Sequence, residues 1–168
     1  LLRDEGSGFD LVSGGELYEL FADGSGTDLG SVGNDALPAV MCSNGDGGSQ
    51  LLIISAGLGF IFSLTSGTLT PISAAGFPAQ AVTAAYLDGY FLALSHGNLF
   101  MVSSLEDGTA WEALDFGTKS QASDRIVGLS VHQNELWLLG SKTTEPWRDV
   151  GDQDFPFAPI PGGLSDVG

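Results

Sequence analysis

The chain has 168 residues, 43% of them hydrophobic, so it is long enough for one domain with a buried core. Lys and Arg number 5 against 21 Asp and Glu, which gives a formal net charge of −16. A surface this acidic repels phosphate groups, which argues against nucleic-acid binding through a basic patch and against docking on an anionic membrane.

Short apolar segments bounded by turn residues recur along the chain, and helical periodicity is nearly absent. Most of the 25 glycines stand beside Asp, Asn or Ser, a pattern typical of tight turns. In chain order, the expected strands are 9–12, 16–21, 28–32, 39–43, 50–56, 59–64, 68–72, 81–86, 90–94, 98–103, 126–131, 135–140 and 143–147. The Trp- and Asp-containing stretch that ends at Phe116 is interpreted as a connection.

Four units share one plan: an apolar strand, a tight turn, a second strand and a looser third. They recur about every 40 residues, which is the period of a propeller blade. One such sheet cannot bury both of its apolar faces, whereas radial stacking against neighbouring sheets does so. The expected fold class is therefore all-β, a β-propeller region over 1–168. Its units fall at approximately 1–35, 36–76, 77–120 and 121–161.

A β-sandwich or jelly roll is the alternative, because it also strings short strands together. The propeller is favoured because the third unit repeats the strand order and turn positions of the second. Since four blades close only rarely, and the chain starts at Leu1 rather than Met, we expect a partial propeller and a piece of a longer chain. Five aromatic side chains inside strands are expected to pack between sheets: Tyr18, Phe60, Phe62, Phe100 and Trp137.

No residue pattern points to catalysis, a cofactor or a metal. Cys42, the single cysteine, lies in an apolar strand without a neighbouring base. His96 and His132 each stand beside a turn and lack a second ligand at metal-binding spacing. The Asp- and Gly-containing stretches 22–25 and 44–48 offer too few oxygens for Ca²⁺ and are expected to be hairpin turns.

Two motifs in the last third of the chain carry a resemblance to a known family. The first is Leu105-Glu106-Asp107, and the second is Gly140-Ser141-x-Thr143-x-Glu145, which follows the apolar strand 126–129. In these residues the chain resembles the packaged-DNA stabilisation proteins, also called tail hub proteins, of short-tailed bacteriophages. The resemblance covers 87–161 best. Pro146 departs from the pattern and predicts that the strand ends there or lies at an edge.

The resemblance implies a propeller-type protein that assembles as a ring below the portal after the genome is packed. Members close the head exit channel, stabilise packaged DNA and join the portal or adaptor to the tail spike or fibre and the needle. The implied partners are those proteins and other copies of the chain, as a hexamer by family analogy. No catalytic residue, cofactor, direct sequence-specific nucleic-acid binding or membrane contact is implied. The expected location is the virion, with assembly in the host cytoplasm.

Two other classes of function stay open on the residues alone. One is a propeller that binds ligands or acts on glycans in its central channel, and the other is a bacterial surface or secreted repeat protein. The acidity suits a part that must sit near the DNA exit without binding DNA. A ring of copies on a portal would favour the phage role over both alternatives.

Overall fold

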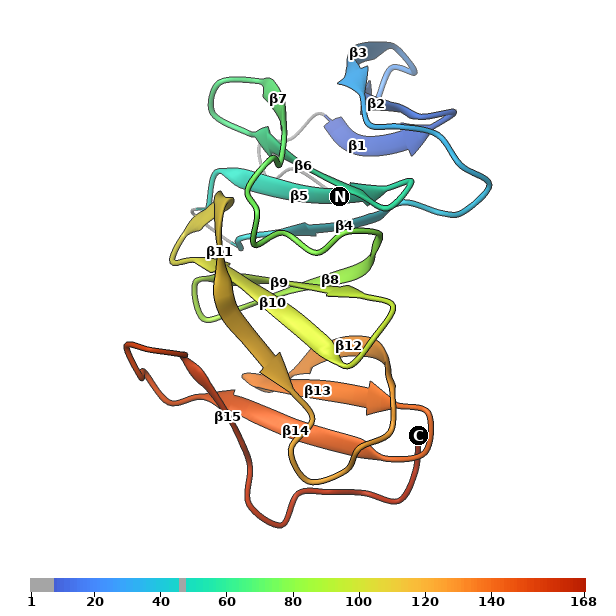
Figure 1. Cartoon of the computed structure of the whole chain (residues 1–168). Coiled ribbons are helices and arrows are strands. Elements are labelled where there is room, and N and C mark those ends of the chain that lie inside the picture. The colour runs from blue at the N-terminus through green and yellow to red at the C-terminus, as the bar shows by residue number, and fades with distance from the viewer. Residues whose placement is uncertain (1–7, 46–47) are drawn as a thin grey trace.

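The computed structural model describes residues 8–45 and 48–168, which form 15 β-strands joined by turns and loops (Figure 1). The strands make four antiparallel sheets, and each sheet consists of consecutive strands. The described residues contain no helix, and hence none that could cross a membrane. The all-β class predicted from the sequence is confirmed.

Strands in each sheet lie side by side in the order of the sequence. Sheet A contains β1 (Gly8–Ser13), β2 (Glu16–Phe21) and β3 (Gly26–Ser31). Sheet B contains β4 (Val40–Ser43), β5 (Gln50–Ser55), β6 (Leu58–Ser63) and β7 (Thr68–Pro71). Sheet C contains β8 (Ala81–Leu87), β9 (Tyr90–Ser95), β10 (Leu99–Ser104) and β11 (Asp107–Thr118). Sheet D contains β12 (Ile126–His132), β13 (Glu135–Gly140), β14 (Thr144–Asp149) and β15 (Phe157–Pro159).

Each sheet contains one hairpin closed by a two-residue turn in which both central residues have positive φ. This left-handed pairing is the type I′ geometry, whose twist matches that of antiparallel strands. Asn, Asp and Gly tolerate it best, and they occupy most of these positions. The four turns are Gly14-Gly15, Ala56-Gly57, Asp88-Gly89 and Gln133-Asn134.

The two middle sheets are apolar on both faces because each lies between two others. In β5, Leu51 and Ile53 pack toward sheet A, whereas Leu52 and Ile54 pack toward sheet C. Successive side chains of a strand point to opposite faces, so a continuous apolar run marks a strand that is buried on both sides. The same holds for 91–94 in β9, where alternate residues join the cores against sheets B and D.

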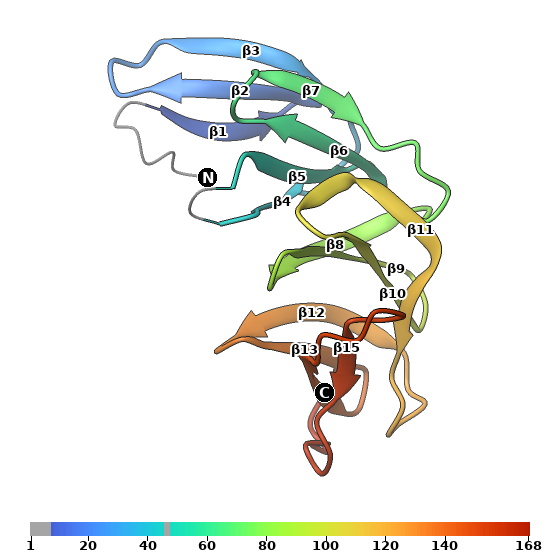
Figure 2. The same cartoon turned by 90° about the vertical axis from the view of Figure 1, so that its left-hand side faces the viewer.

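The sheets fan out in the order A, B, C, D along the molecule (Figure 2). In sheets B, C and D the first strands come close together, since β8 contacts both β4 and β12, whereas sheet A contacts sheet B through β3 and β7. The last strands, β7, β11 and β15, form the opposite edges of their sheets. This is radial stacking around an inner row of strands, as in a propeller.

The sequence-based prediction missed two strands, β11 and β15. The stretch interpreted as a connection is the 12-residue strand β11, which pairs with β10 from Leu99↔Thr118 to Ser104↔Asp107. Its ladder has two register shifts, one on each side of the Ser103↔Trp111 pair, and they break the period-two pattern by which strands are recognised. β15 has only 3 residues, follows Pro156 and ends at Pro159, so it gives almost no signal of its own.

The expectation for Pro146 was wrong. β14 continues to Asp149 and pairs on both sides, with β13 and with β15. In an extended strand the N–H and C=O of one residue point to the same side, and the Pro146 carbonyl accepts from Ile160 N at 2.8 Å, just beyond β15. The missing N–H therefore also faces that side, and the pairing of Pro146 with Trp137 loses no hydrogen bond.

Candidate functional site

The motif Leu105-Glu106-Asp107 forms the turn between β10 and β11. Glu106 has a φ of +55°, and its backbone N–H donates to Gly89 O at 2.7 Å, which ties this turn to the neighbouring turn between β8 and β9. Leu105 points outward, 61% exposed. The carboxylates of Glu106 and Asp107, by contrast, face residues of sheets B and C.

Glu106 connects side chains from two sheets. Its carboxylate accepts from the Tyr86 hydroxyl of β8 at 2.8 Å and from Asn44 Nδ2, just after β4, at 3.3 Å. Burial, with the Glu106 hydrogen bond and charge adding to it, raises the pKa of Tyr86 to about 12. The neutral phenol is therefore the form that donates to Glu106.

Asp107 and Gln50 make the second link between the same two sheets. Gln50, at the start of β5, accepts from the backbone N–H of Gly108 at 2.7 Å and places its amide nitrogen 3.5 Å from Asp107 Oδ1. Asp107 also accepts from the Thr109 hydroxyl and N–H, and these bonds lower the pKa of its carboxyl. We call the set of Asn44, Gln50, Tyr86, Glu106 and Asp107 the B–C clasp.

The second motif fastens the segment between β11 and β12 onto sheet D. The Lys119 ammonium, with a side chain only 1% exposed, forms an ion pair with Asp124 at 2.7 Å and donates to Thr143 O at 2.8 Å. Asp124 accepts from the N–H groups of Lys142 and Thr143 at 2.8 and 3.1 Å. These bonds, the one from Lys119 above all, hold the pKa of Asp124 far below its usual range.

Gly140 gives this cluster its space. A Cβ atom there would collide with the Asp124 carboxylate, the Lys119 ammonium and the carbonyl of Thr143. Gly140 N donates to that same carbonyl at 2.8 Å, and Ser141 N donates to Arg125 O at 2.9 Å. The motif glycine is thus required by close approach and not by an unusual φ.

Glu145 is fully buried and is held by four donors. One oxygen accepts from the N–H and hydroxyl of Ser120 and from Trp147 Nε1, at 2.9 to 3.1 Å, and the other accepts from Gln121 N at 3.0 Å. Several hydrogen bonds of this kind offset the cost of burying a carboxyl group. We call Lys119, Asp124, Gly140, Thr143 and Glu145, with Ser120 and Gln121, the C–D clasp.

The two motifs therefore lie at two separate junctions between neighbouring sheets. Sequence reasoning missed their partners, because Asn44, Gln50, Tyr86, Lys119 and Asp124 come from distant segments. Among these partners, only Lys119 stands out in the sequence, because it is one of 5 Lys and Arg residues in a chain with 21 acidic residues. Each hydroxyl in the two clusters donates to a carboxylate that other donors also bind, so the arrangement is suited to holding sheets together.

The remaining chemical candidates show no catalytic geometry. Burial raises the pKa of the Cys42 thiol to about 12, which opposes thiolate formation. His96 is exposed and lies 3.1 Å from the Arg125 guanidinium, and His132 is exposed at the end of β12. Among residues 8–45 and 48–168, no three His, Cys, Asp or Glu side chains are placed to hold a metal ion.

The first of the two glycine-containing loops, 22–25, forms a closed hairpin turn. In the first, Asp23 Oδ1 accepts from Ser25 N and Ser25 Oγ at 2.8 and 2.6 Å, which closes the turn between β2 and β3 as predicted. The second loop, 44–48, includes residues 46 and 47, which lie outside the described residues.

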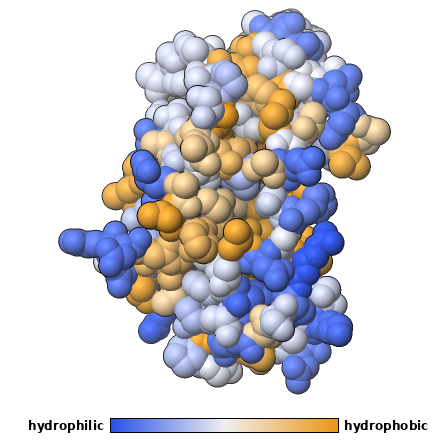
Figure 3. Space-filling view, in the orientation of Figure 1, coloured by the Kyte–Doolittle hydropathy of each residue, from blue (hydrophilic) through white to orange (hydrophobic). Residues whose placement is uncertain are grey.

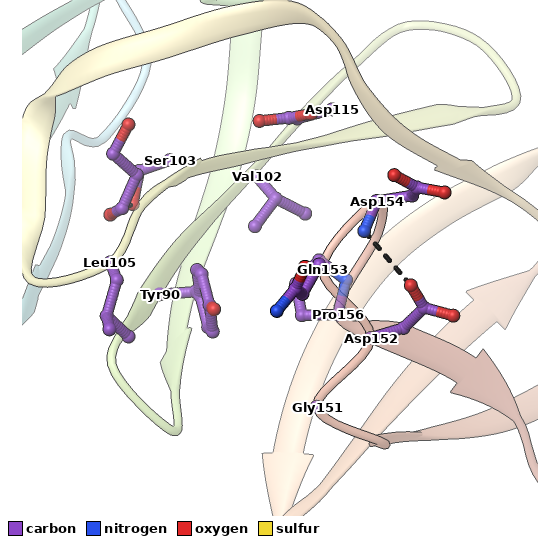
Figure 4. Close-up of a pocket in the computed structure, with 11 residues that line it drawn as sticks. Tyr90, Val102, Ser103, Leu105, Asp115, Gly151, Asp152, Gln153, Asp154 and Pro156 are labelled. Atoms are coloured by element: carbon purple, nitrogen blue, oxygen red, sulfur yellow. Dashed lines mark hydrogen bonds between the residues drawn. The ribbon is translucent and has the colours of Figure 1, made fainter.

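A shallow pocket of about 300 Å³ opens between sheets C and D. Tyr90 and Asp115 line it from sheet C, and the loop after β14 contributes Gly151 to Asp154 (Figure 4). In that loop Asp154 N donates to Asp152 Oδ1 at 3.0 Å. Burial, aided by the charges of Asp149 and Asp115, raises the pKa of Tyr90. The pocket is thus acidic and offers no activated nucleophile among the described residues that line it.

Comparison with solved structures identifies the class of fold as a β-propeller. A chain of the mitotic checkpoint complex aligns over 83% of this chain and 42% of its own length, with a TM-score of 0.59 and 18% identity. The computationally designed Ika8 protein (0.56, 12%, covering 95% and 48%) and YCF48 bound to D1 peptide (0.56, 12%, covering 97% and 56%) are also similar. The chain spans about half the length of these propellers. At such identities the likeness concerns the fold alone.

The amino-acid sequence gives a more specific assignment than the fold does. It matches, over residues 7–168, the family model described as "Phage_stabilise: Bacteriophage P22 Gp10, beta-propeller", and the chain belongs to this family of phage structural proteins. No curated protein sequence matches it. The family resemblance and the propeller fold inferred from the sequence are confirmed.

Proposed function

We propose that the chain is a structural part of the phage tail or neck. In this role it closes the head exit channel, stabilises the packaged DNA and joins the portal or adaptor to the tail spike or fibre and the needle. The family match over residues 7–168 is the observation that carries the proposal. Ring formation with further copies and residence in the virion belong to the same proposal.

The two clasps support a mechanical role. A part that holds pressurised DNA must resist separation of its sheets, and both junctions described above include hydrogen bonds to carboxylates. Such bonds are stronger than those between neutral groups. The net charge of −16 further favours a part that lies beside DNA without binding it.

Cryo-electron microscopy of intact particles tests the proposal. We expect propeller-shaped density for this chain in a ring at the neck, and heads made without it should package DNA and then lose it. Absence of the chain from purified particles would contradict the proposal. So would a monomeric chain that hydrolyses a glycan, which is the alternative of a glycan-acting propeller.

A further inference from the structure

The edge strand of sheet C carries a bulge that holds an apolar side chain in solvent. From Trp111 to Phe116, β11 advances five residues while β10 advances only two, between Ser103 and Met101. Three additional residues therefore leave the ladder, and Leu114 among them is 84% exposed. Bulges redirect side chains. A large apolar side chain within a β-strand is seldom exposed to water to this extent.

The base of this bulge is firmly supported. Trp111 is buried, its Nε1 donates to Gly108 O at 2.7 Å, and Phe77 packs edge-on against it with ring centroids 5.1 Å apart. The loop before β8 lies against the start of the bulge, where a Cβ at Gly76 would collide with the backbone of Glu112. Leu114 is therefore presented from a fixed base rather than from a loose loop.

Leu114 belongs to a larger apolar surface. Phe116, two residues further on, is 40% exposed. Leu99, its diagonal neighbour across the β10–β11 ladder, is 43% exposed. Hydrophobic residues gather in the middle of the face on which β11 lies (Figure 3). We call Leu99, Leu114 and Phe116 the Leu114 patch.

Carboxylates border the patch. Glu112 is exposed beside Leu114 on one side, and half-buried Asp115 follows on the other. Asp115 also faces the pocket that Asp152 and Asp154 line (Figure 4). The patch thus combines an apolar centre with an acidic border, in a chain whose net charge is already −16.

We propose that the Leu114 patch docks a protein partner that presents an apolar socket rimmed by Lys and Arg. Charge complementarity determines this choice, because rim charges select partners and like charges exclude them. A second copy of the chain would bring more carboxylates to the same border and is disfavoured. The inference is argued from this surface alone and does not rest on the proposed neck role.

NMR titration of the ¹⁵N-labelled chain tests the proposal with two synthetic probes. One is a short peptide with an apolar centre and lysines at both ends, and the other has glutamates in place of the lysines. We expect the lysine peptide to shift the amide signals of Leu99 and of 112–118. Added salt should weaken the binding of this peptide. Leu114→Ser should raise its Kd about tenfold or more, as for the central residue of an interface.

The matched control is Leu37→Ser, which removes another leucine that is 72% exposed and lies on a different loop. Because both leucines are exposed, both variants should keep the wild-type unfolding midpoint, and the control should bind as the wild type does. Equal binding by Leu114→Ser, equal binding of the glutamate peptide, or shifts centred elsewhere would each overturn the proposal. Concentration-dependent broadening at the patch without peptide would assign it to a second copy and overturn it too.

Discussion

At Gly140, the absence of a side chain makes room for the ion pair between Lys119 and Asp124. Gly140→Ala would force the carboxylate and the ammonium apart, and we expect it to lower the free energy of unfolding by about 2–3 kcal/mol. Denaturant titration followed by circular dichroism measures this loss. Gly97→Ala is the control, because a Cβ there meets nothing within 4 Å, and it should leave stability unchanged or slightly raised.

Asp124 also makes the C–D clasp sensitive to acid. Its folded-state pKa lies below the usual value of 3.8, so its stabilising effect is present above that pH and is lost as pH falls through the folded-state pKa. Asp124→Asn should therefore be less stable than wild type by a constant amount at neutral pH, and the difference should shrink below about pH 4. Denaturant midpoints measured down to about pH 2 test this.

The control for the acid experiment is Asp88→Asn, a change at a type I′ turn where Asn is equally suited. Its difference from wild type should not show the same dependence on pH. A pH-independent difference for Asp124→Asn would contradict the assigned role of the Lys119 bond.

At the scale of the elements, the B–C clasp attaches the turn between β10 and β11 of sheet C to the neighbouring sheet B. The Glu106 charge and hydrogen bond are among the causes that raise the Tyr86 pKa to about 12. In Glu106→Gln the repulsion between carboxylate and phenolate disappears, so the Tyr86 pKa should fall toward the usual tyrosine value of 10.0. Ultraviolet titration of the folded chain detects this, and Tyr86→Phe identifies which transition belongs to Tyr86.

The same junction should weaken in alkali. A raised folded-state pKa means that the stabilising effect of Tyr86 is complete below the unfolded value and is lost as pH rises from about 10 to about 12. Tyr86→Phe cannot ionise, so its stability should decline less over this range than that of wild type. An identical decline in the two proteins would contradict the raised pKa of Tyr86.

Hairpins were the part of the fold that the sequence specified most directly. Asp88-Gly89 and Gln133-Asn134 lie between apolar runs, and local turn chemistry alone places both turns. β11 was missed because its pairing is irregular on either side of Trp111, whose ring packs against Phe77 from a segment far away in sequence. The clasp residues share this difficulty, since Asn44 and Glu106 are 62 residues apart.

At the scale of the whole molecule, aromatic residues reveal which sheet faces have a neighbour. Phe60, Phe62 and Phe100 are buried between sheets, as predicted. Tyr18 and Trp137 are only half-buried, because they lie on the faces of sheets A and D that point away from sheets B and C. Trp137 Nε1 is buried without an acceptor among the described residues. Sequence patterns could not distinguish these faces, because the apolar run 136–139 in the outer sheet D resembles the runs of the middle sheets.

Those two faces should govern the behaviour of the isolated chain in solution. Leu11 and Leu139 are partly exposed there, and apolar sheet faces of this kind associate when nothing covers them. The net charge of −16 opposes association, so self-association should increase with salt, which screens repulsion beyond about 10 Å at 0.1 M. Sedimentation velocity at several protein and salt concentrations measures it. The double variant Leu11→Ser and Leu139→Ser should sediment as a monomer where the wild type does not, whereas Leu37→Ser should behave as wild type. Equal association of all three proteins would mean that the chain does not associate through these faces of sheets A and D.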